Sequence, residues 1–219
     1  MIVFSSSEVY GKGVTVPFSE DDDRLMGPTH KLRWSYAAGK AVDECLAQSY
    51  WQQQQLPVTV VRCFNTCGPR QSSAYGMVIP NMIERALRHE PILVFGDGHQ
   101  SRCFSSVSDV VRGVLMLMDS KQAEGEIFNV GTDEEVTVLE LAERVRRICN
   151  SRSTIQFVPY EQVYGRSFED MMRRVPSLVK INGCTGYRPE VSLDQLLELT
   201  VRDMCGQLGV PVPAGAAAF

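Results

Sequence analysis

The sequence predicts an α/β protein built around a parallel sheet. Short apolar runs, which fit strands buried on both faces, alternate with longer amphipathic stretches that fit helices. The first two strand-like runs, residues 1–6 and 58–65, are separated by a helical stretch of about twenty residues, the length of a βαβ crossover. Because such crossovers join parallel strands, we expect these two strands to lie in one parallel sheet.

The first elements follow from local patterns. Residues 1–6 form an apolar run that breaks directly into polar residues, as a buried parallel strand does. A loop marked by glycines, prolines and an acidic run comes next. Residues 34–54 carry apolar side chains at helical spacing, and Pro57 ends that helix. The run 58–65 begins with β-branched residues, which favour a strand.

The remaining elements alternate in the same way. Helices are predicted at residues 78–90, 106–120, 137–150 and 191–209. Strands are predicted at residues 91–96, 125–132 and 153–160. We expect Ser108 or Asp109 to cap the second of these helices and Thr137 to cap the third, because short polar side chains accept the first free N–H groups.

Composition excludes several classes of protein. A net charge of -4 gives no basic surface for a nucleic acid. No apolar run is long enough to cross a membrane, and the N-terminus does not resemble a signal peptide, so we expect a cytoplasmic protein without a membrane partner. The seven cysteines form no CxxC pair and read as reduced thiols, and the three scattered histidines predict no metal site.

The polar residues that follow the first two strands are the first functional candidates. Parallel sheets place their functional groups at the carboxyl ends of the strands. Ser5, Ser6 and Glu8 lie at the end of the first strand, and Asn65 lies at the end of the second. Since the helix between these strands begins near Tyr36, we expect the three clusters to share one rim of the sheet.

Tyr36 and Lys40 form a second candidate pair. Four residues are slightly more than one helical turn, so both side chains stand on the same helix face. A phenol has a pKa of about 10, and a nearby ammonium group favours the phenolate and lowers that value. Such a phenolate can take the proton of a substrate hydroxyl. This step is useful when a hydride leaves the same carbon for a nicotinamide cofactor.

Five sequence motifs indicate a resemblance to a family that uses this chemistry. "SSSEVYG", "YAAGK", "RCFNTCGPRQ", "VFGDGHQSRCFSSVSDVVRG" and "RRVPSLVKI...GYRP" occur in this order. Together they resemble the extended short-chain dehydrogenases/reductases, in particular NAD-dependent nucleotide-sugar epimerases, dehydratases and decarboxylases such as UDP-glucose 4-epimerase. The resemblance implies a partial doubly wound, Rossmann-like parallel sheet with a smaller C-terminal α/β substrate-binding region.

The resemblance also implies roles for single residues. Ser6 and Tyr36 match the catalytic hydroxyl and the base, and Lys40 matches the lysine that lowers the pKa of that base and binds the nicotinamide ribose. Ser5, Tyr36 and Lys40 would contact NAD. Glu8 matches an acidic position that some dehydratases and decarboxylases use beyond the hydride step.

Three further positions match substrate-binding residues of that family. Asn65 would contact the sugar diphosphate, and Arg102 and Arg174 would grip the phosphates or a sugar carboxylate, for which a planar guanidinium is well suited. Structural roles remain open for several candidates. Residues 5–7 fit a solvated turn, Arg102 fits a brace for a loop, and Glu8 fits a structural hydrogen-bond acceptor.

One family motif is absent from the sequence. No G-x-x-G-x-x-G or G-x-G-x-x-G segment, the loop that holds the pyrophosphate of NAD, occurs in the chain. The resemblance then implies that residues 1–70 are the C-terminal part of a Rossmann-like NAD-binding domain. Residues 71–208 would be mainly the nucleotide-sugar-binding region, with 100–125 returning to the Rossmann-like part, and 209–219 a flexible tail.

Two functions are compatible with these observations. The first is an enzyme that oxidises a hydroxyl of a nucleoside-diphosphate sugar at C4, through a 4-keto intermediate. The second is a catalytically impaired, truncated homologue that binds nucleotide or self-associates without turnover. Because the first strand would expose an apolar edge, we also expect a homo-oligomer with an interface at residues 1–9 and 58–64.

Overall fold

A computed structural model describes residues 1–74, 77–164 and 171–216 of the chain. Its first sheet contains β1 (Ile2–Ser6), β2 (Thr59–Cys63) and β7 (Ile127–Val130) in the order β1-β2-β7. All neighbours in this sheet are parallel, and Ser6 is the register partner of Cys63. The predicted parallel βαβ unit is therefore confirmed, and the carboxyl ends of β1 and β2 lie side by side.

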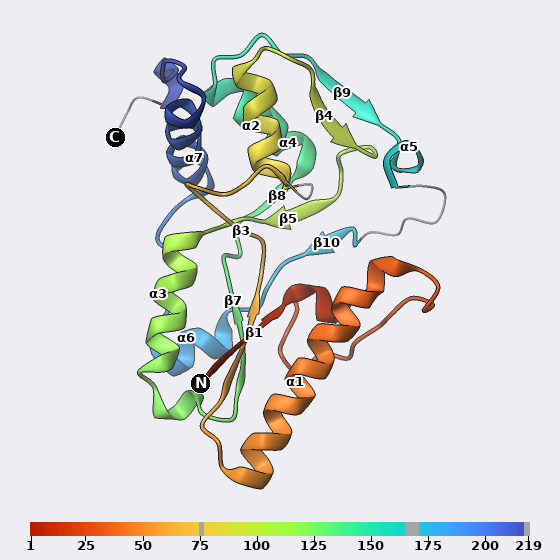
Figure 1. Cartoon of the computed structure of the whole chain (residues 1–219), viewed down its shortest axis with the longest axis vertical. Coiled ribbons are helices and arrows are strands. Elements are labelled where there is room, and N and C mark those ends of the chain that lie inside the picture. The colour runs from red at the N-terminus through yellow and green to blue at the C-terminus, as the bar shows by residue number, and fades with distance from the viewer. Residues whose placement is uncertain (75–76, 165–170, 217–219) are drawn as a thin grey trace.

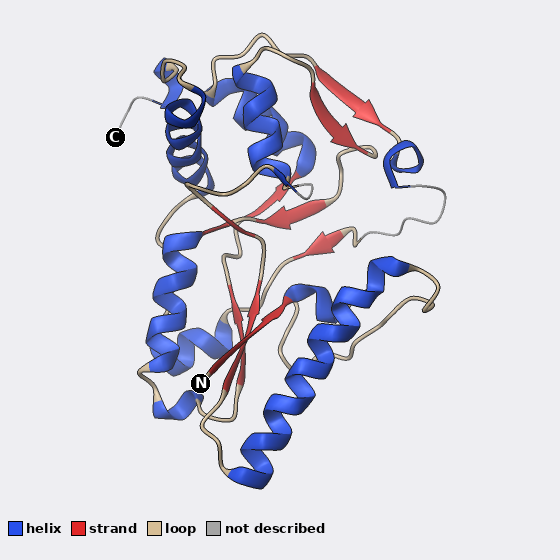
Figure 2. Ribbon diagram, viewed as in Figure 1, coloured by secondary structure: helices blue, strands red, loops and turns tan. Residues whose placement is uncertain are grey.

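Helices cover both faces of this sheet (Figures 1 and 2). α1 (Ser35–Gln54) packs on one face, while α3 (Val107–Met118) and α6 (Val179–Thr185) lie on the other. Consecutive residues of β2 serve the two faces, since Val60 packs with Ala47 of α1 and Val61 belongs to the cluster around α3. This alternation explains why β2 carries two apolar residues in succession, Val60 and Val61.

The predicted cap of α3 was wrong. Its N-cap is Ser106, whose hydroxyl accepts the Ser108 N–H at 3.3 Å. Asp109 lies inside the first turn and is buried, and its carboxylate accepts the backbone N–H groups of Glu190 and Val191 at 3.0 and 2.9 Å. The carboxylate of Asp109 is thus used in a contact with a distant segment, although local spacing favoured this residue as a helix cap.

The predicted self-association surface is only partly accessible. β2 is the central strand, and Val58, Val60 and Val61 are fully buried inside the chain, so the expected interface at residues 58–64 was wrong. β1 forms one edge of the sheet and pairs only with β2 within the described residues. Phe4 on this strand is 53% exposed.

The second half of the chain builds a separate core. Its three main helices are α2 (Val78–Leu87), α4 (Val138–Ile148) and α7 (Leu193–Leu208). These helices bury most of their apolar side chains against one another and against the parallel pair β4 (Ile92–Phe95) and β9 (Ile155–Val158). Three short strands form a further sheet in the order β10 (Arg173–Arg174), β5 (Ser101–Cys103) and β8 (Glu135–Thr137).

Short elements connect the two halves. The remaining strand pair joins β3 (Thr66–Cys67) to β6 (Ser105–Ser106) in parallel. The other short helices are η1 (Ser7–Tyr10), η2 (Leu32–Trp34), η4 (Lys121–Ala123), α5 (Tyr160–Tyr164) and η5 (Ala214–Ala216). Within the segment 100–125, β5 belongs to the second half, while α3 and Ala123 of η4 pack on the first sheet.

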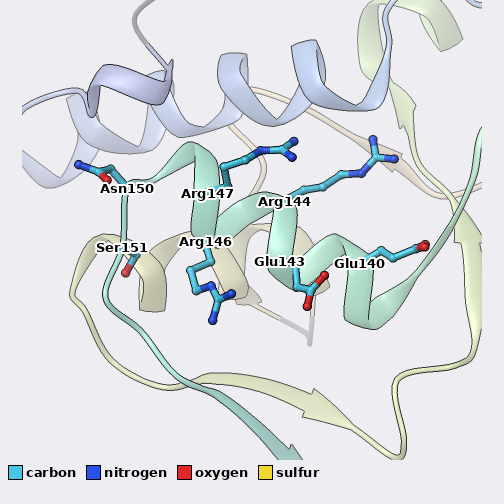
Figure 3. A pocket seen from close by; sticks show the side chains of 7 residues that line it. All are labelled: Glu140, Glu143, Arg144, Arg146, Arg147, Asn150 and Ser151. Carbon is cyan, nitrogen blue, oxygen red and sulfur yellow. The ribbon is translucent and has the colours of Figure 1, made fainter.

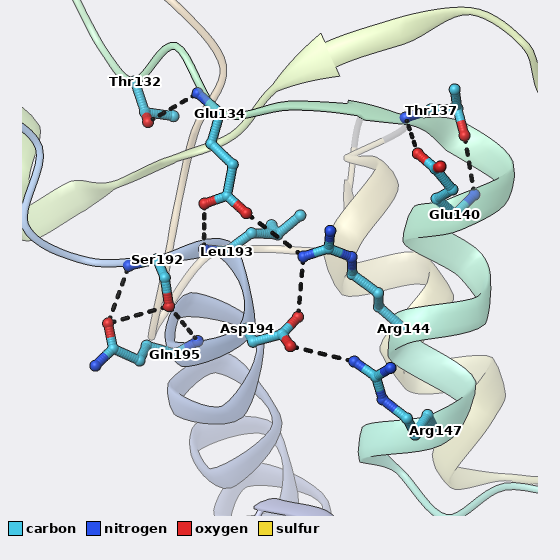
Figure 4. Close-up of polar contacts among 10 residues, drawn as sticks. All are labelled: Thr132, Glu134, Thr137, Glu140, Arg144, Arg147, Ser192, Leu193, Asp194 and Gln195. Atoms are coloured by element: carbon cyan, nitrogen blue, oxygen red, sulfur yellow. Dashed lines mark hydrogen bonds and ion pairs between the residues drawn. The ribbon is translucent and has the colours of Figure 1, made fainter.

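Helices α4 and α7 begin with matching caps (Figure 4). Thr137 caps α4 as predicted, in a capping box with Glu140, and Ser192 forms the same arrangement with Gln195 at the start of α7. Arg144 of α4 contacts Asp194 of α7 at 3.2 Å. These contacts satisfy free backbone groups and fix the relative position of the two helices.

The C-terminal segment is partly packed. Residues 214–216 form η5, Ala216 is fully buried, and its carbonyl oxygen accepts Nε of Arg202 at 2.6 Å. The segment 209–219, expected to be a flexible tail, thus includes a packed turn, and residues 217–219 lie outside the described part. In the described ranges, no helix combines the length and the apolar character that a membrane span requires.

Candidate active site

A cleft of about 1160 Å³ opens at the carboxyl ends of β1 and β2. Its other walls come from the second half of the chain, including α2, β4 and β5. All predicted site residues except Lys40 line this cleft, namely Ser5, Ser6, Glu8, Tyr36, Asn65, Arg102 and Arg174. The structure thus brings together residues that lie up to 169 positions apart, from Ser5 to Arg174.

Tyr36 and Lys40 occupy the first turns of α1. Tyr36 lines the cleft and is 54% exposed, and no protein group in the described residues bonds its hydroxyl. Lys40 donates to the carbonyl oxygen of Phe4 at 2.9 Å and to Asp43 Oδ2 at 3.2 Å. Lys40 therefore attaches α1 to β1 beside the cleft, and its effect on the Tyr36 phenol stays a prediction.

The serines at the end of β1 have different environments. Ser6 lines the cleft, and its hydroxyl accepts the Glu8 N–H at 3.3 Å. Ser5 is buried and donates its hydroxyl to Oε1 of Glu44 on α1. The side chain of Ser5 is thus committed to a contact inside the protein, and its predicted contact with a cofactor stays a prediction.

Glu44 belongs to a buried polar network that sequence reasoning missed. Its carboxylate receives Nε and Nη2 of Arg62 at 3.0 and 2.8 Å. Arg62 lies on β2 and also donates to the hydroxyl of Tyr10 at 3.0 Å. Since all of these side chains are buried, each charge is compensated by a direct partner. The sequence contained one signal for Glu44, which was its spacing: Tyr36, Lys40 and Glu44 recur every four residues and so lie on one face of α1.

Glu8 is held by two arginines in the cleft wall. Arg33 binds it with Nη1 and Nη2 at 2.6 and 3.1 Å, and Nη1 of Arg174 also donates to it. Burial alone would raise the pKa of the Glu8 carboxyl, but the positive charges of Arg174 and Arg33 outweigh it and lower that pKa below 4.5. Glu8 is consequently a carboxylate in the folded protein at neutral pH.

The two predicted arginines are both buried. Arg102 donates Nη1 to the carbonyl oxygen of Ser101 at 2.7 Å, which fits the brace that the sequence left open. Arg174 has a buried Nε without a hydrogen-bond partner in the described structure. A buried N–H of this kind has a high cost unless an acceptor arrives, so Arg174 is suited to an anionic ligand.

The cleft also contains two thiols. Cys63 and Cys67 line it, and burial raises their pKa values to about 11 and about 12. Both side chains are therefore neutral thiols at neutral pH, and neither has the character of a nucleophile.

A second hollow lies on the surface of α4 (Figure 3). Its charged side chains point in different directions, and Arg144 and Arg147 reach toward α7, where both contact Asp194. The residues that line this hollow include no tyrosine and none of the predicted site residues, so we assign the candidate site to the first cleft.

The residues present fit one end of NAD. Ser6 and Tyr36 lie on the cleft wall at the end of β1, and Lys40 follows one turn later on α1, where a nicotinamide ribose could be bound. The sequence contains no glycine-rich loop for the pyrophosphate. The chain thus has side chains suited to the nicotinamide end of NAD, and its sequence lacks the glycine-rich motif that binds the pyrophosphate.

A parallel sheet with helices on both faces, and with serine, tyrosine and lysine at its carboxyl edge, defines the class of extended short-chain dehydrogenases/reductases. Residues 1–131 match the NAD dependent epimerase/dehydratase family. The chain belongs to this family, as the order of its motifs suggested.

Relatives in this family give more detail. A UDP-N-acetyl-alpha-D-glucosaminuronate decarboxylase from Bacillus cytotoxicus is 46% identical over 203 residues, covering 92% of this chain and 62% of the relative. UDP-glucuronic acid decarboxylase 2 from Arabidopsis thaliana is 36% identical over 202 residues, covering 92% of this chain and 43% of the relative. The chain therefore spans between 43% and 62% of the length of these proteins.

Solved structures share the fold over nearly the whole chain. An epimerase from Methanothermobacter thermautotrophicus superimposes with a TM-score of 0.84 at 27% identity, covering 95% of this chain and 60% of that protein. A UDP-glucuronic acid 4-epimerase from Bacillus cereus, in complex with UDP-glucuronic acid and NAD, gives a TM-score of 0.82 at 27% identity. That match covers 94% of this chain and 61% of the epimerase. The expected Rossmann-type fold is confirmed.

Proposed function

We propose that the chain carries the sugar-binding and proton-transfer residues of an NAD-dependent enzyme that decarboxylates a UDP-linked uronic acid. The observation that carries this proposal is the buried Nε of Arg174, which faces no acceptor in the described structure. A sugar carboxylate would supply that acceptor and its negative charge. The names of the decarboxylases that are 46% and 36% identical to the chain support the same substrate class.

In this proposal Tyr36 takes the proton from the C4 hydroxyl of the sugar, and Ser6 donates a hydrogen bond to the same oxygen. When bound, NAD would supply the hydride chemistry at C4, and Tyr36 and Lys40 would hold its nicotinamide ribose. The resulting 4-keto sugar has its carboxylate on C5, next to the ketone.

The second step breaks the bond between C5 and the carboxyl carbon. The electron pair of that bond moves toward the C4 carbonyl oxygen, CO2 leaves, and a proton then adds at C5. Arg174 orients the carboxylate, and the ionised Glu8 lies beside it in the same wall. When the ketone is reduced again, Tyr36 returns its proton to the C4 oxygen.

A second candidate is a protein that binds the sugar nucleotide without turnover. This candidate concerns the chain taken by itself, whose given sequence contains no glycine-rich loop of the kind that holds the pyrophosphate of NAD. Self-association through the free edge of β1 belongs to the same candidate, and light scattering coupled to gel filtration measures it.

The test combines the chain with NAD and UDP-glucuronate or UDP-N-acetylglucosaminuronate labelled with ¹³C in the carboxyl group. The proposal predicts that the label appears as bicarbonate, and that Tyr36→Phe stops its release while calorimetry shows unchanged binding. Retention of the label with inversion at C4 would indicate an epimerase instead. Binding without any conversion would support the second candidate.

A further inference from the structure

Gln100 lines the cleft immediately before β5 and is 6% exposed. Its Nε2 donates to the carbonyl oxygen of Phe95 at 2.8 Å, and this bond fixes which way the side-chain amide points, because a carbonyl only accepts. No group in the described residues donates to the other polar atom, Oε1. This oxygen is also not among the side-chain atoms that are closed off from solvent without a partner. Gln100 therefore presents one oriented, unused acceptor to the cleft.

The position of Gln100 follows from the short sheet in the cleft wall. Gln100 and Arg102 are two residues apart and both line the cleft, as alternate residues of a strand do, with Cα atoms about 7 Å apart. Arg102 is the register partner of Arg174 on β10, about 5 Å away across the sheet. In the other direction, the bond from Gln100 leads to Phe95 at the end of β4. Along this wall the order is therefore Arg174, Arg102, Gln100 and Phe95.

The end of the cleft beyond Gln100 is apolar and aromatic. Leu93 and Phe95 of β4 line it together with Tyr160 of α5. The Tyr160 ring lies against the turn that follows β4, because a side chain at Gly96 would meet this ring at 2.5 Å. Such side chains pack well against a flat ring. The two ends of the cleft thus suit different parts of one ligand, a charged group near Arg174 and a ring near Phe95.

We infer that Oε1 of Gln100 accepts a hydrogen bond from a ribose hydroxyl of the nucleotide, and so makes the site selective for ribonucleotides. This inference rests on the proposed function. A nucleoside diphosphate sugar has the order sugar, diphosphate, ribose and base. With the sugar carboxylate on Arg174, the diphosphate reaches Arg102. The base then lies at the end with Phe95, and the ribose lies at Gln100 between them.

The chemistry of Oε1 agrees with this placement. The oxygens of an ionised diphosphate only accept hydrogen bonds, so they cannot pair with the carbonyl oxygen of an amide. A ribose hydroxyl can donate, and it is the nearest donor beyond the diphosphate. Without a donor, Oε1 would lose its contact with water when the ligand fills the cleft and would gain nothing in return.

A purely structural role for Gln100 makes a different prediction. Its bond to Phe95 closes the turn between β4 and β5, so its loss could weaken every nucleotide equally. The contact through Oε1 concerns only nucleotides that carry the hydroxyl. The ratio of the affinities for UDP and its deoxy analogues therefore separates the two roles, and it requires neither NAD nor turnover.

Calorimetry with UDP, 2′-deoxy-UDP and 3′-deoxy-UDP tests this inference and identifies the hydroxyl. We expect at least one deoxy nucleotide to bind the wild-type chain about tenfold more weakly than UDP, because Oε1 is then left without a donor in a nearly dry wall. Gln100→Leu should bind UDP and that analogue about equally. Gln100→Glu keeps an acceptor oxygen and should keep the wild-type ratio within about threefold.

Gln71→Leu is the matched control. Gln71 also lines the cleft, and its Nε2 also donates to a backbone carbonyl, that of Thr66, at 3.2 Å. Its Oε1, in contrast to that of Gln100, is closed off from solvent. The replacement should leave the ratio of UDP to deoxy nucleotide unchanged. Loss of the ratio in this control would show that the ratio reports general damage to the cleft and would overturn the assignment to Gln100.

The remaining outcomes are also decisive. Equal binding of UDP and both deoxy nucleotides to the wild-type chain would overturn the inference, and so would a ratio that Gln100→Leu retains. Weaker binding of 3-methyl-UDP that depends on Gln100 would move the contact to the base and overturn the assignment to ribose. If Gln100→Leu does not fold, Gln100→Glu decides, because loss of the ratio in a variant that keeps an acceptor would contradict the inference.

Failure of this inference and failure of the proposed function give different results. A wild-type chain that binds neither UDP nor UDP-glucuronate would remove both. A chain that binds UDP-glucuronate and does not distinguish ribose from deoxyribose would remove only the role of Gln100.

Discussion

The hydroxyl of Ser5 donates to the carboxylate of Glu44, so the residue next to the candidate catalytic Ser6 is tied to the helix that carries Tyr36. Arg62 completes this contact from β2 by binding both oxygens of the same carboxylate. The relative position of Ser6 and Tyr36 is therefore set by buried polar groups below the cleft.

The first prediction concerns this network. Glu44→Gln leaves the buried guanidinium of Arg62 without its counter-charge and should lower the free energy of unfolding by about 3–5 kcal/mol. Ser5→Ala removes one hydrogen bond and should cost about 1 kcal/mol. Urea denaturation measures both. Arg88→Met, which removes an exposed ion pair with Glu84, should change stability by less than about 1 kcal/mol. Equal effects in all three variants would contradict the importance of burial.

The second prediction concerns how the stability of the folded protein changes at acidic pH. The pKa of Glu8 is lower in the folded protein than its ordinary value of 4.5. Its ionised form therefore contributes stability above about pH 4.5, and this contribution is lost as the pH falls through the lower folded value. Glu8→Gln should be less stable than the wild type at pH 7, with a smaller difference at pH 3. A difference that stays constant between these pH values would argue against an ionised Glu8.

The third prediction concerns Tyr36. This residue is more than half exposed and its hydroxyl bonds no described protein group, so Tyr36→Phe should leave the melting temperature unchanged within about 1 °C. In a preparation that turns over, the same change should lower kcat by about a hundredfold or more, because the base is lost. Thermal denaturation and the labelled-carboxyl assay measure these two effects. A marked loss of stability would indicate a packing role instead.

The fourth prediction concerns Arg174. Arg174→Lys keeps the positive charge but loses the planar fork and the Nε donor. We expect UDP-glucuronate to bind about tenfold more weakly to this variant, while UDP-glucose binds nearly as before. Isothermal titration gives both affinities. Unchanged binding of the uronic acid would show that the unpaired Nε of Arg174 does not contact a carboxylate.

Local patterns predicted the parts of the fold that depend on local geometry. Tyr36 and Lys40 share a face of α1 because four residues are close to one helical turn. Thr137 caps α4 because a threonine followed three residues later by a glutamate forms a capping box in almost any context. The meeting of Ser6 with the end of β2 follows from the geometry of a βαβ unit.

The missed features depend on contacts between distant residues. One of the two arginines that bind Glu8 is 166 positions away, and no spacing rule predicts such a pair. Asp109 is a favourable cap by its chemistry, yet the backbone of Glu190 and Val191 uses its carboxylate instead. Ala216 is buried by docking on α4 and α7, which a small apolar residue near the terminus does not reveal.

The pair of Glu8 and Arg174 joins the two halves of the molecule, since Glu8 follows β1 and Arg174 belongs to the sheet with β5 and β8. Arg174 holds Glu8 through Nη1 while its Nε has no partner in the described structure, so Arg174 can bind a ligand without giving up this pair. A bound anion would then join the ion pair that already connects the two halves.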